Sequence, residues 1–288
     1  MDQLLSPKQV ASAIGASESS VKRWCDQGLL NTVKTAGGHR RIPIQEALRF
    51  ARERNIASAE PHLLAMVTTT DRKSRRVENG PERLIEAMLN GNETRCNSIV
   101  FEYFQAGVSV SRIFDDIVTP ALRTLGEKWG CKELEIYEER SACQIMLQIL
   151  HELRRKQLAP VTQRSAMGAT CEGDPYSLPI MMGEIVLRSV GWDTRLLGCS
   201  IPFSSATKAI QQHQPAIFWL SISSIMDELA FIAEYNQLYE VASKTNTAVV
   251  VGGRALTAAI RTRMRYSAFC DTMQHLEEFA KTLQHRSS

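Results

Sequence analysis

The amino-acid sequence predicts an α + α/β protein in three parts, and three observations support this fold class. Residues 1–55 contain two short helical patterns followed by a basic hairpin pattern. Residues 80–157 show the apolar spacing of helices throughout. Over residues 160–288 short apolar runs alternate with helix-length segments, which is the pattern of a parallel sheet covered by helices. A polar stretch over residues 56–79 is expected to link the first part to the second.

The first part is expected to begin with a pair of helices. Pro7 suits the first turn of one helix, and Gly15 makes the turn that follows it. Ser17 is a good N-cap for a second helix over residues 18–26, which Gly28 is expected to end. The second helix has an apolar stripe on one face and polar or basic side chains on the other.

A basic hairpin is expected after the second helix, turned by Ala36-Gly37-Gly38. This combination suits a DNA duplex, because the helix can enter the major groove while the hairpin contacts the adjacent phosphates. A solvated basic helix beside a glycine turn is the alternative. The residues expected to bind DNA are Ser19, Ser20, Lys22 and Arg23 on the helix and Lys34, Thr35, His39, Arg40 and Arg41 on the hairpin.

The order "SVKRW", "GLL", "GGHRRI" and "PIQEALRFARERN" resembles the winged helix-turn-helix of MerR-type transcriptional regulators. The resemblance covers roughly the first 55 residues. It implies a head that reads one half-site of double-stranded DNA, so the protein should act as a dimer or tetramer. The charge agrees, since residues 1–54 carry nine Lys/Arg against five Asp/Glu, whereas the net charge of the whole chain is only +3.

Composition and motifs argue against several other classes of protein. A hydrophobic content of 44% with 23% charged residues is ordinary for a soluble globular protein. No membrane-spanning run and no signal peptide is evident, so a cytoplasmic, nucleoid-associated location is expected. The seven cysteines form no CxxC pair, which favours reduced core residues over a zinc site. The sequence has no Walker loop, nucleophile elbow or zinc-spaced histidine pair, so we expect a protein that is not an enzyme.

A bundle of four amphipathic helices is expected between residues 80 and 157. Apolar residues recur at helical spacing in four segments separated by short breaks. Pro120 is expected to kink or restart the third helix. The four segments lie around residues 84–89, 99–104, 110–129 and 138–155.

Five strand–helix units are expected over residues 160–288. The strands are the apolar runs "SAMGATC", "TRLLGC", "AIFWLSIS", "TAVVVGG" and "SAFC", each followed by a helix-length segment. This pattern predicts a five-stranded parallel sheet with helices on both faces, that is, a flavodoxin-like (Rossmann-like) fold. Ligands of such folds bind in the loops at the C-terminal ends of the strands.

The order of bundle and then open sheet resembles the cobalamin-binding module of methionine synthase and corrinoid proteins. Joined to a MerR-type head, it resembles the light-responsive, cobalamin-dependent repressors of carotenoid genes. The combined resemblance covers nearly the full chain. It implies that the bundle covers the upper face of the corrin and that the sheet domain holds the nucleotide tail.

The bundle signature of that family is a Trp followed ten residues later by Glu-His. This sequence has Trp129, Glu139 and Arg140 at these positions. The apolar ring and the acid are present, but an arginine cannot coordinate cobalt. Packing in the bundle core is the alternative role for Trp129.

The second signature is the loop Asp/Glu-x-His-x-x-Gly after the first strand, whose histidine ligates cobalt. Here Asp174 keeps the acid, but Tyr176 replaces the histidine and Pro179 replaces the glycine. A phenol with a pKa of about 10 is a poor ligand at neutral pH, and the proline fills space that the glycine leaves open. The tail-holding positions Ser221, Ser223, Gly252 and Gly253 agree with the family, although open sheets that bind nothing also have such glycines.

These observations predict a sequence-specific DNA-binding transcriptional regulator, most simply a repressor. No cofactor is expected to be held through histidine, so the regulator should act without cobalamin or with another ligand. A light-sensing regulator that binds cobalamin without a protein ligand to cobalt is the alternative. A corrinoid-carrying methyl-transfer subunit is a further alternative, and it calls for a histidine where Tyr176 stands.

Overall fold

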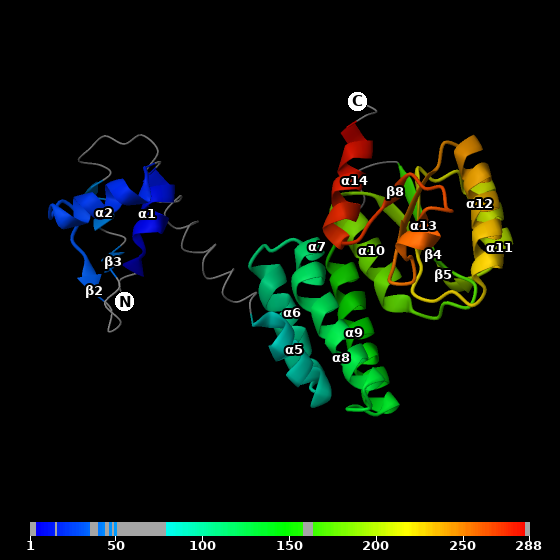
Figure 1. Ribbon diagram of the computed structural model, residues 1–288, viewed down its shortest axis with the longest axis horizontal. Coiled ribbons are helices and arrows are strands. Elements are labelled where there is room, and N and C mark those ends of the chain that lie inside the picture. The colour runs from blue at the N-terminus through cyan, green and yellow to red at the C-terminus, as the bar shows by residue number, and fades with distance from the viewer. Residues whose placement is uncertain are drawn as a thin grey trace. The chain divides into compact units, whose positions relative to one another are not determined.

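The computed structural model describes residues 4–14, 16–34, 40–43, 46–47, 49–50, 79–157 and 164–285. The chain divides into two compact units, residues 1–79 and residues 80–288, which we call unit 1 and unit 2 (Figure 1). Nearly all of the expected linker, residues 56–78, lies outside the described residues. Among the described helices, none has both the length and the apolar character needed to cross a membrane.

Unit 1 combines a pair of helices with a small antiparallel sheet. The sheet has the order β1-β3-β2, and α1 packs against α2. Buried apolar side chains from both helices and from β1 and β3 form its core. The elements are β1 (Leu4–Leu5), α1 (Pro7–Ile14), α2 (Glu18–Asp26), β2 (Val33–Lys34) and β3 (Arg40–Pro43).

The local signals expected around α2 are confirmed. The hydroxyl of Ser17 accepts the backbone N–H of Ser20 at 3.1 Å, as an N-cap does. Gly28 has a φ of +71°, a left-handed conformation that glycine adopts without strain just after a helix. Val21 is buried, with Trp24 and Cys25 packed against the same core. The expected hairpin turn at residues 36–38 lies outside the described residues.

Unit 2 begins with helices that lie close to the segments expected from the sequence. Buried apolar residues at helical spacing face the interior of the bundle. Short turns containing Gly91 and Gly107, both at positive φ, separate the first three segments. The elements are α5 (Gly80–Leu89), α6 (Glu93–Gln105), α7 (Val110–Ile113), η1 (Phe114–Val118), α8 (Thr119–Gly130) and α9 (Ile136–Lys156).

Of the two outcomes expected at Pro120, a kink or a restart of the helix, the structure shows a restart, because α8 begins at Thr119 with the proline in its first turn. The irregular stretch is η1, one π-helical turn that precedes the proline, and the α-helix continues through Pro120 as α8. The N–H of Thr119 bonds to the carbonyl of Phe114, five residues earlier. Proline has no N–H to offer and its ring crowds the preceding turn. The wider turn upstream accommodates the ring without breaking the helix.

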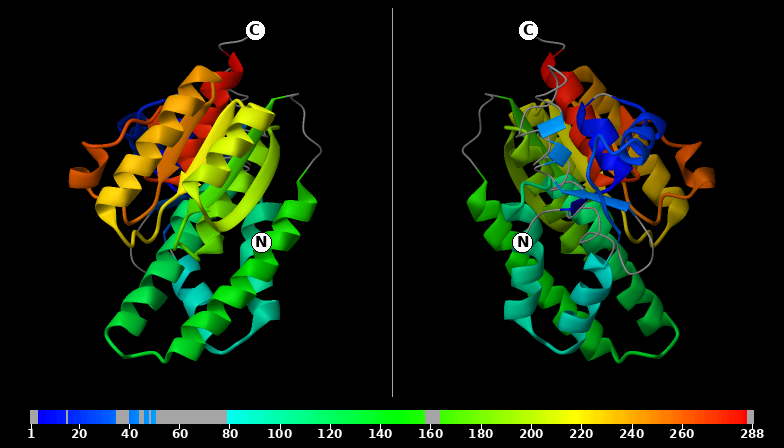
Figure 2. Two further views of the ribbon diagram at one scale, coloured as in Figure 1. Left: turned by 90° about the vertical axis from the view of Figure 1, so that its right-hand side faces the viewer. Right: turned by 90° about the vertical axis from the view of Figure 1, so that its left-hand side faces the viewer.

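The second half of unit 2 is a parallel sheet with helices on both faces, as the sequence predicted (Figure 2). The strand order is β5-β4-β6-β7-β8, and all neighbours are parallel. The elements are β4 (Ser165–Cys171), α10 (Ser177–Ser189), β5 (Asp193–Ile201), α11 (Phe203–His213), β6 (Ile217–Ser221), α12 (Glu228–Lys244), β7 (Ala248–Gly252), α13 (Ala258–Arg261), β8 (Ala268–Phe269) and α14 (Met273–His285).

The two faces of the sheet carry different side chains, because successive residues of a strand point in opposite directions. Met167 and Ala169 of β4 belong to the core that α11 and α12 cover. Gly168, between them, belongs to the opposite face, where α10 and α14 contact each other. α10 is buried at every position from Ile180 to Leu187, since it packs against the sheet, α9 and α14.

Polar contacts join the bundle to the sheet half of unit 2. The guanidinium of Arg154 on α9 donates to the buried carboxylate of Glu184 on α10 at 2.8 Å. The carboxylate of Asp115, in η1, accepts the backbone N–H groups of Met273 at 2.8 Å and Gln274 at 2.9 Å, at the start of α14. Each contact gives a hydrogen-bond partner to a polar group that packing would otherwise bury without one.

Candidate functional site

The strand order of unit 2 reverses direction between β4 and β6. The chain moves from β4 outward to β5 and then returns to the other side of β4 to form β6. At such a switch point the loops after the two central strands diverge and leave a crevice at the C-terminal edge of the sheet. The loops concerned are residues 172–176 and 222–227. They contain several residues expected to form a ligand site.

Asp174 organises the loop after β4. Its side chain is fully buried, and its Oδ1 accepts the backbone N–H of Tyr176 at 3.1 Å. Its Oδ2 accepts the backbone N–H of Ser223 at 2.5 Å, across the switch point. The carboxylate therefore holds the loops after β4 and β6 together, and each of its oxygens already has a backbone donor.

Tyr176, at the position where the resemblance calls for histidine, is half-buried. The guanidinium of Arg254, from the loop after β7, lies over its ring at 5.2 Å from the centroid. The same guanidinium donates to the carbonyl of Ser223 at 3.3 Å. Arg254 was not expected from the sequence, although it directly follows the Gly252-Gly253 pair that was.

The glycines after β7 are required by close backbone packing. A Cβ on Gly252 would lie 2.7 Å from the carbonyl oxygen of Cys270, and one on Gly253 would overlap the carbonyl of Ile222. Gly253 also has a φ of +121°, which side chains rarely adopt. Ser221 is nearly buried at the end of β6. The structure thus gathers Asp174, Tyr176, Ser221, Ser223, Gly252 and Gly253 in one cluster at the strand ends.

The three expected bundle residues lie apart from this cluster in their contacts. Trp129 in the last turn of α8 is 44% exposed, which excludes the alternative that it packs in the bundle core. Arg140 on α9 pairs with the neighbouring Glu139 at 3.5 Å, and Glu139 accepts the thiol of Cys143 at 3.3 Å. No hydrogen bond, ion pair or ring contact between described residues connects them to the strand-end cluster.

Comparison with known proteins agrees with this fold. Residues 81–154 match the B12 binding domain family model. The fold is similar to that of the monomethylamine corrinoid protein of Methanosarcina barkeri, with a TM-score of 0.58 at 16% identity over 69% of this chain and 96% of that one. No curated protein sequence matches the chain.

Two further solved structures show weaker overall agreement. A cobalamin-binding protein from Desulfitobacterium hafniense is 17% identical over 70% of this chain and 96% of its own, with a TM-score of 0.37. The methanol:cobalamin methyltransferase complex of Methanosarcina barkeri is 15% identical over 70% of this chain and 78% of its own, with a TM-score of 0.38. The fold of unit 2 is supported by the likeness to the monomethylamine corrinoid protein, and at 16% identity that likeness extends to the fold alone.

A corrinoid is the ligand that the B12 binding domain match implies, and the donor groups at the strand ends do not fit cobalt ligation. The described strand-end cluster offers a carboxylate, a phenol, a guanidinium and hydroxyls, but no imidazole. Cys171 is close by, yet burial raises the pKa of its thiol to about 12, and the thiol donates to the carbonyl of Ser224. A protonated thiol is not a metal ligand.

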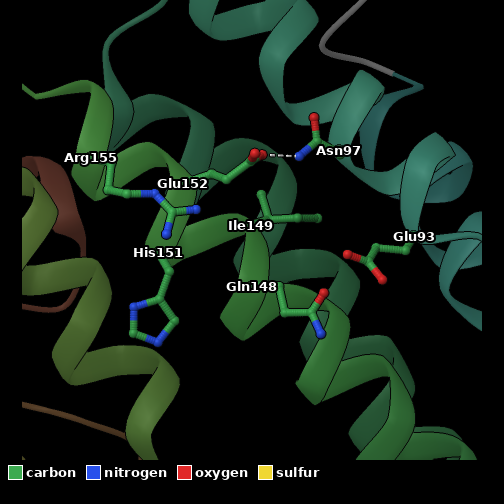
Figure 3. A pocket seen from close by; sticks show the side chains of 7 residues that line it. All are labelled: Glu93, Asn97, Gln148, Ile149, His151, Glu152 and Arg155. Carbon is green, nitrogen blue, oxygen red and sulfur yellow. Dashed lines mark hydrogen bonds between the residues drawn. The ribbon is translucent and has the colours of Figure 1, made fainter.

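Two cavities in unit 2 lie elsewhere. One, of about 360 Å³, is an open pocket bordered by side chains of α6 and α9, where Asn97 donates to Glu152 (Figure 3). The other, of about 310 Å³, lies where α9, α10 and β5 meet, and Arg154 and Glu184 line it. Neither cavity contains a residue that the sequence singled out. The first is lined by Glu93, Asn97, Gln148, Ile149, His151, Glu152 and Arg155.

The residues expected to bind DNA are only partly described. Lys22 and Arg23 are exposed on α2, and Lys22 pairs with Glu18 at 2.7 Å. Arg40 and Arg41 are half-buried on β3, and Arg40 pairs with Asp26. The hydroxyls of Ser19 and Ser20 each bond to the hydroxyl of Ser17, at 2.9 and 2.8 Å. The backbone of Lys34 lies in β2, whereas Thr35 and His39 fall outside the described residues.

Proposed function

We propose that the protein is a sequence-specific DNA-binding transcriptional regulator, with unit 1 as a winged helix-turn-helix head and unit 2 as a B12-type module. One observation carries the proposal: a capped helix with Lys22 and Arg23 on its exposed side is followed by an antiparallel strand pair rich in cations. An α-helix fits the DNA major groove, and flanking cations fit the phosphates.

The ion pairs within unit 1 are compatible with this role. Lys22 with Glu18 and Arg40 with Asp26 are exposed pairs, and such pairs contribute only about 0–1 kcal/mol to stability. Phosphate groups can therefore replace the carboxylates at little cost. The pairs also hold the two cations in position before DNA arrives, which reduces the entropy lost on binding.

The proposal includes self-association. One head of this size reads one half-site, so specific binding calls for a dimer or tetramer on a repeated site. Unit 2 is the part of the chain available for this assembly. We further propose that the protein acts as a repressor and is not an enzyme, since the strand-end cluster uses its buried carboxylate for structure.

The regulator proposal is tested with DNA selected by the full-length protein from a pool of random duplexes. Arg23→Ala should weaken binding to the selected duplex by roughly 10-fold or more and make the dependence of affinity on salt less steep. Lys244→Ala removes the same charge from an exposed position of α12 and should leave the affinity unchanged. Failure to enrich any sequence, or equal losses in both variants, would contradict the proposal.

A second candidate function is corrinoid binding, and the match of residues 81–154 to the B12 binding domain favours it. In this form unit 2 would hold cobalamin without histidine in a light-sensing regulator, or would carry a corrinoid for methyl transfer. Tyr176 supports the first version over the second, because a carrier subunit of the expected type uses a histidine there.

Spectroscopy and DNA binding together separate the two candidates. The full-length protein is mixed with hydroxocobalamin or adenosylcobalamin, passed through a desalting column and examined for bound absorption. DNA affinity is then measured in the dark and after illumination, with and without adenosylcobalamin. Equal affinity in all four conditions supports the ligand-independent regulator. A shift that requires cobalamin supports the light-sensing version, and bound corrinoid without any DNA binding supports the carrier.

A further inference from the structure

On the face of the sheet that α10 covers, a tryptophan side chain packs directly against a glycine of the neighbouring strand. Trp219 of β6 and Gly168 of β4 are register partners, so both point to the same face of the sheet. A Cβ added to Gly168 would overlap the six-membered ring of the Trp219 indole. The indole therefore lies flat across the glycine. No other residue could stand at position 168 beside this side chain.

A second glycine, on the helix that covers this face, lies beside the five-membered ring of the same indole. A Cβ on Gly183 of α10 would lie 3.0 Å from Nε1 of Trp219 and 3.3 Å from its Cδ1. Leu276 of α14 borders the same space, 3.4 Å from that Cβ position. Two glycines, one on the sheet and one on the covering helix, thus leave a space beside them, here called the slot, and the indole fills it.

The indole is buried in this slot without a polar partner. Trp219 is 4% exposed, and its Nε1 has no hydrogen-bond acceptor among the described residues. Buried tryptophan N–H groups usually find an acceptor, because an unpaired one costs free energy. The ring is therefore held by shape, between two backbone segments, and not by a hydrogen bond.

The slot lies directly below the candidate site. Gly168 is three residues before the end of β4, about 10 Å below the loop that contains Asp174. It lies between β4 and β6, the two strands at the switch point. A flat group entering at the strand ends and passing between the sheet and α10 would therefore meet the Trp219 ring.

We propose that the indole of Trp219 occupies the slot in which the aromatic base of a corrinoid nucleotide tail would be housed. Indole and dimethylbenzimidazole are both flat, fused two-ring systems of similar width, so one excludes the other. Trp219 is then the residue that sets ligand specificity in unit 2. If unit 2 bound a corrinoid, this slot would not admit the aromatic base of its nucleotide tail.

This inference sharpens the corrinoid candidate given above and does not depend on DNA binding. It also accounts for two other residues at the entrance. With the tail excluded, a histidine at position 176 would have no exposed lower face of cobalt to ligate, and Tyr176 stands there instead. Pro179, in the first turn of α10, stands where the family keeps a glycine for the tail to pass.

The test removes the Trp219 indole from the slot and then measures whether an added aromatic base binds in its place. Trp219→Ala in the full-length chain should lower the melting temperature by roughly 10 °C and leave an apolar cavity able to take a flat ring. Adding 5,6-dimethylbenzimidazole should raise the melting temperature of this variant by about 3 °C or more and leave the wild type unchanged. Trp192→Ala is the matched control, because Trp192 is also fully buried with an unpaired Nε1.

A response of both variants to the base, or of neither while both are folded, would overturn the inference. A second measurement covers the case in which Trp219→Ala does not fold. Gly168→Ala should lower the melting temperature strongly in the wild type but much less beside Trp219→Phe, because phenylalanine lacks the second ring. Equal decreases in the two backgrounds would show that the Trp219 ring does not fill the space beside Gly168.

The absorption spectrum of added hydroxocobalamin gives an independent readout. The wild type should bind none, or should bind it with the spectrum of the base-coordinated form. A spectrum with the base released from cobalt in the wild type would overturn the inference. Binding of the selected DNA duplex is measured on the same samples, so failure of the regulator proposal and failure of the Trp219 assignment give different results.

Discussion

The carboxylate of Asp174 accepts the backbone N–H of Ser223 at 2.5 Å, and this contact joins the loops after the two central strands of the sheet. The other oxygen of the carboxylate accepts the N–H of Tyr176 within its own loop. Because the side chain is fully buried, neither backbone group has water as a substitute partner. Asp174, which the sequence analysis placed in a ligand-binding signature, thus has a structural role.

Replacing Asp174 should therefore destabilise unit 2. Asp174→Ala leaves two backbone N–H groups unpaired, and we expect a loss of about 2–4 kcal/mol in the free energy of unfolding. The loss is measured by urea denaturation followed by circular dichroism. Asp193→Ala removes an exposed carboxylate at the start of β5 and should change stability by less than about 0.5 kcal/mol. Similar losses in the two variants would contradict the structural role of Asp174.

Gly253 and Gly91 offer a matched pair for backbone packing. Both have positive φ, at +121° and +62°. A Cβ on Gly253 would overlap the carbonyl of Ile222, whereas nothing lies within 4 Å of one on Gly91. Gly91→Ala should therefore cost about 1 kcal/mol from backbone strain alone, and Gly253→Ala about 3 kcal/mol or more. Urea denaturation of both variants checks this, and an equal cost would show that the strand-end loops can separate freely.

Asp115 makes a testable connection between the bundle and the last helix. Asp115→Ala leaves the first N–H groups of α14 uncapped and should cost about 1–2 kcal/mol. Hydrogen exchange at Met273 and Gln274 should become faster in the variant. Asp116→Ala breaks only the exposed pair with Arg112 at 3.2 Å and should cost less than about 1 kcal/mol. Unchanged exchange at the start of α14 in Asp115→Ala would rule out the cap.

The buried thiol of Cys171 predicts a loss of stability at alkaline pH. Burial raises its pKa to about 12, and the protonated thiol donates to the carbonyl of Ser224. In the unfolded chain the thiol ionises near pH 9, so the folded state binds one more proton between about pH 9 and pH 12. The contribution of Cys171 is thus fully present below about pH 8 and is lost as the pH rises, by up to about 1.4 kcal/mol per pH unit.

Urea denaturation of the wild type and of Cys171→Ala at pH 7.5 and pH 10 measures this contribution. The decrease in the free energy of unfolding between the two pH values should be smaller in the variant, because only the wild type has this thiol to ionise. Other groups titrate equally in both proteins and cancel in the comparison. Identical decreases would mean that the thiol is already accessible to hydroxide in the folded state.

The sequence predicted most of unit 2 because its elements depend on local patterns. Buried strands such as "AVVV" are short apolar runs, and the helices between them have caps and stops at their ends, such as Asp227, which accepts the N–H of Ala230 at 3.0 Å. The restart of the helix at Pro120 was predicted, but the π-helical turn before it was not, since a proline can be accommodated by a kink or by a wider turn upstream. Which of the two occurs depends on packing against neighbouring helices.

The sequence missed the residues that act through distant contacts. Arg254 over Tyr176, Arg154 with Glu184 and Trp219 against Gly168 each join elements far apart in the chain. The glycine inside the "SAMGATC" strand was the one available signal, because a glycine within a strand often marks a close approach by another group. It does not say which group approaches. That Trp129 is exposed, and not in the bundle core, was likewise undecided from spacing alone.

By itself the sequence determined the kinds of elements in unit 2, their order and the residue types at each signature position, because these follow from period, caps and identity. The presence of Tyr176, where the resemblance calls for histidine, is read from the sequence alone. The tertiary structure decided what fills the space behind that position. Strand register and the packing of α10 on the sheet bring Gly168, Gly183 and Trp219 together. The three residues belong to three different elements, so the residue spacing within any single element does not predict this contact.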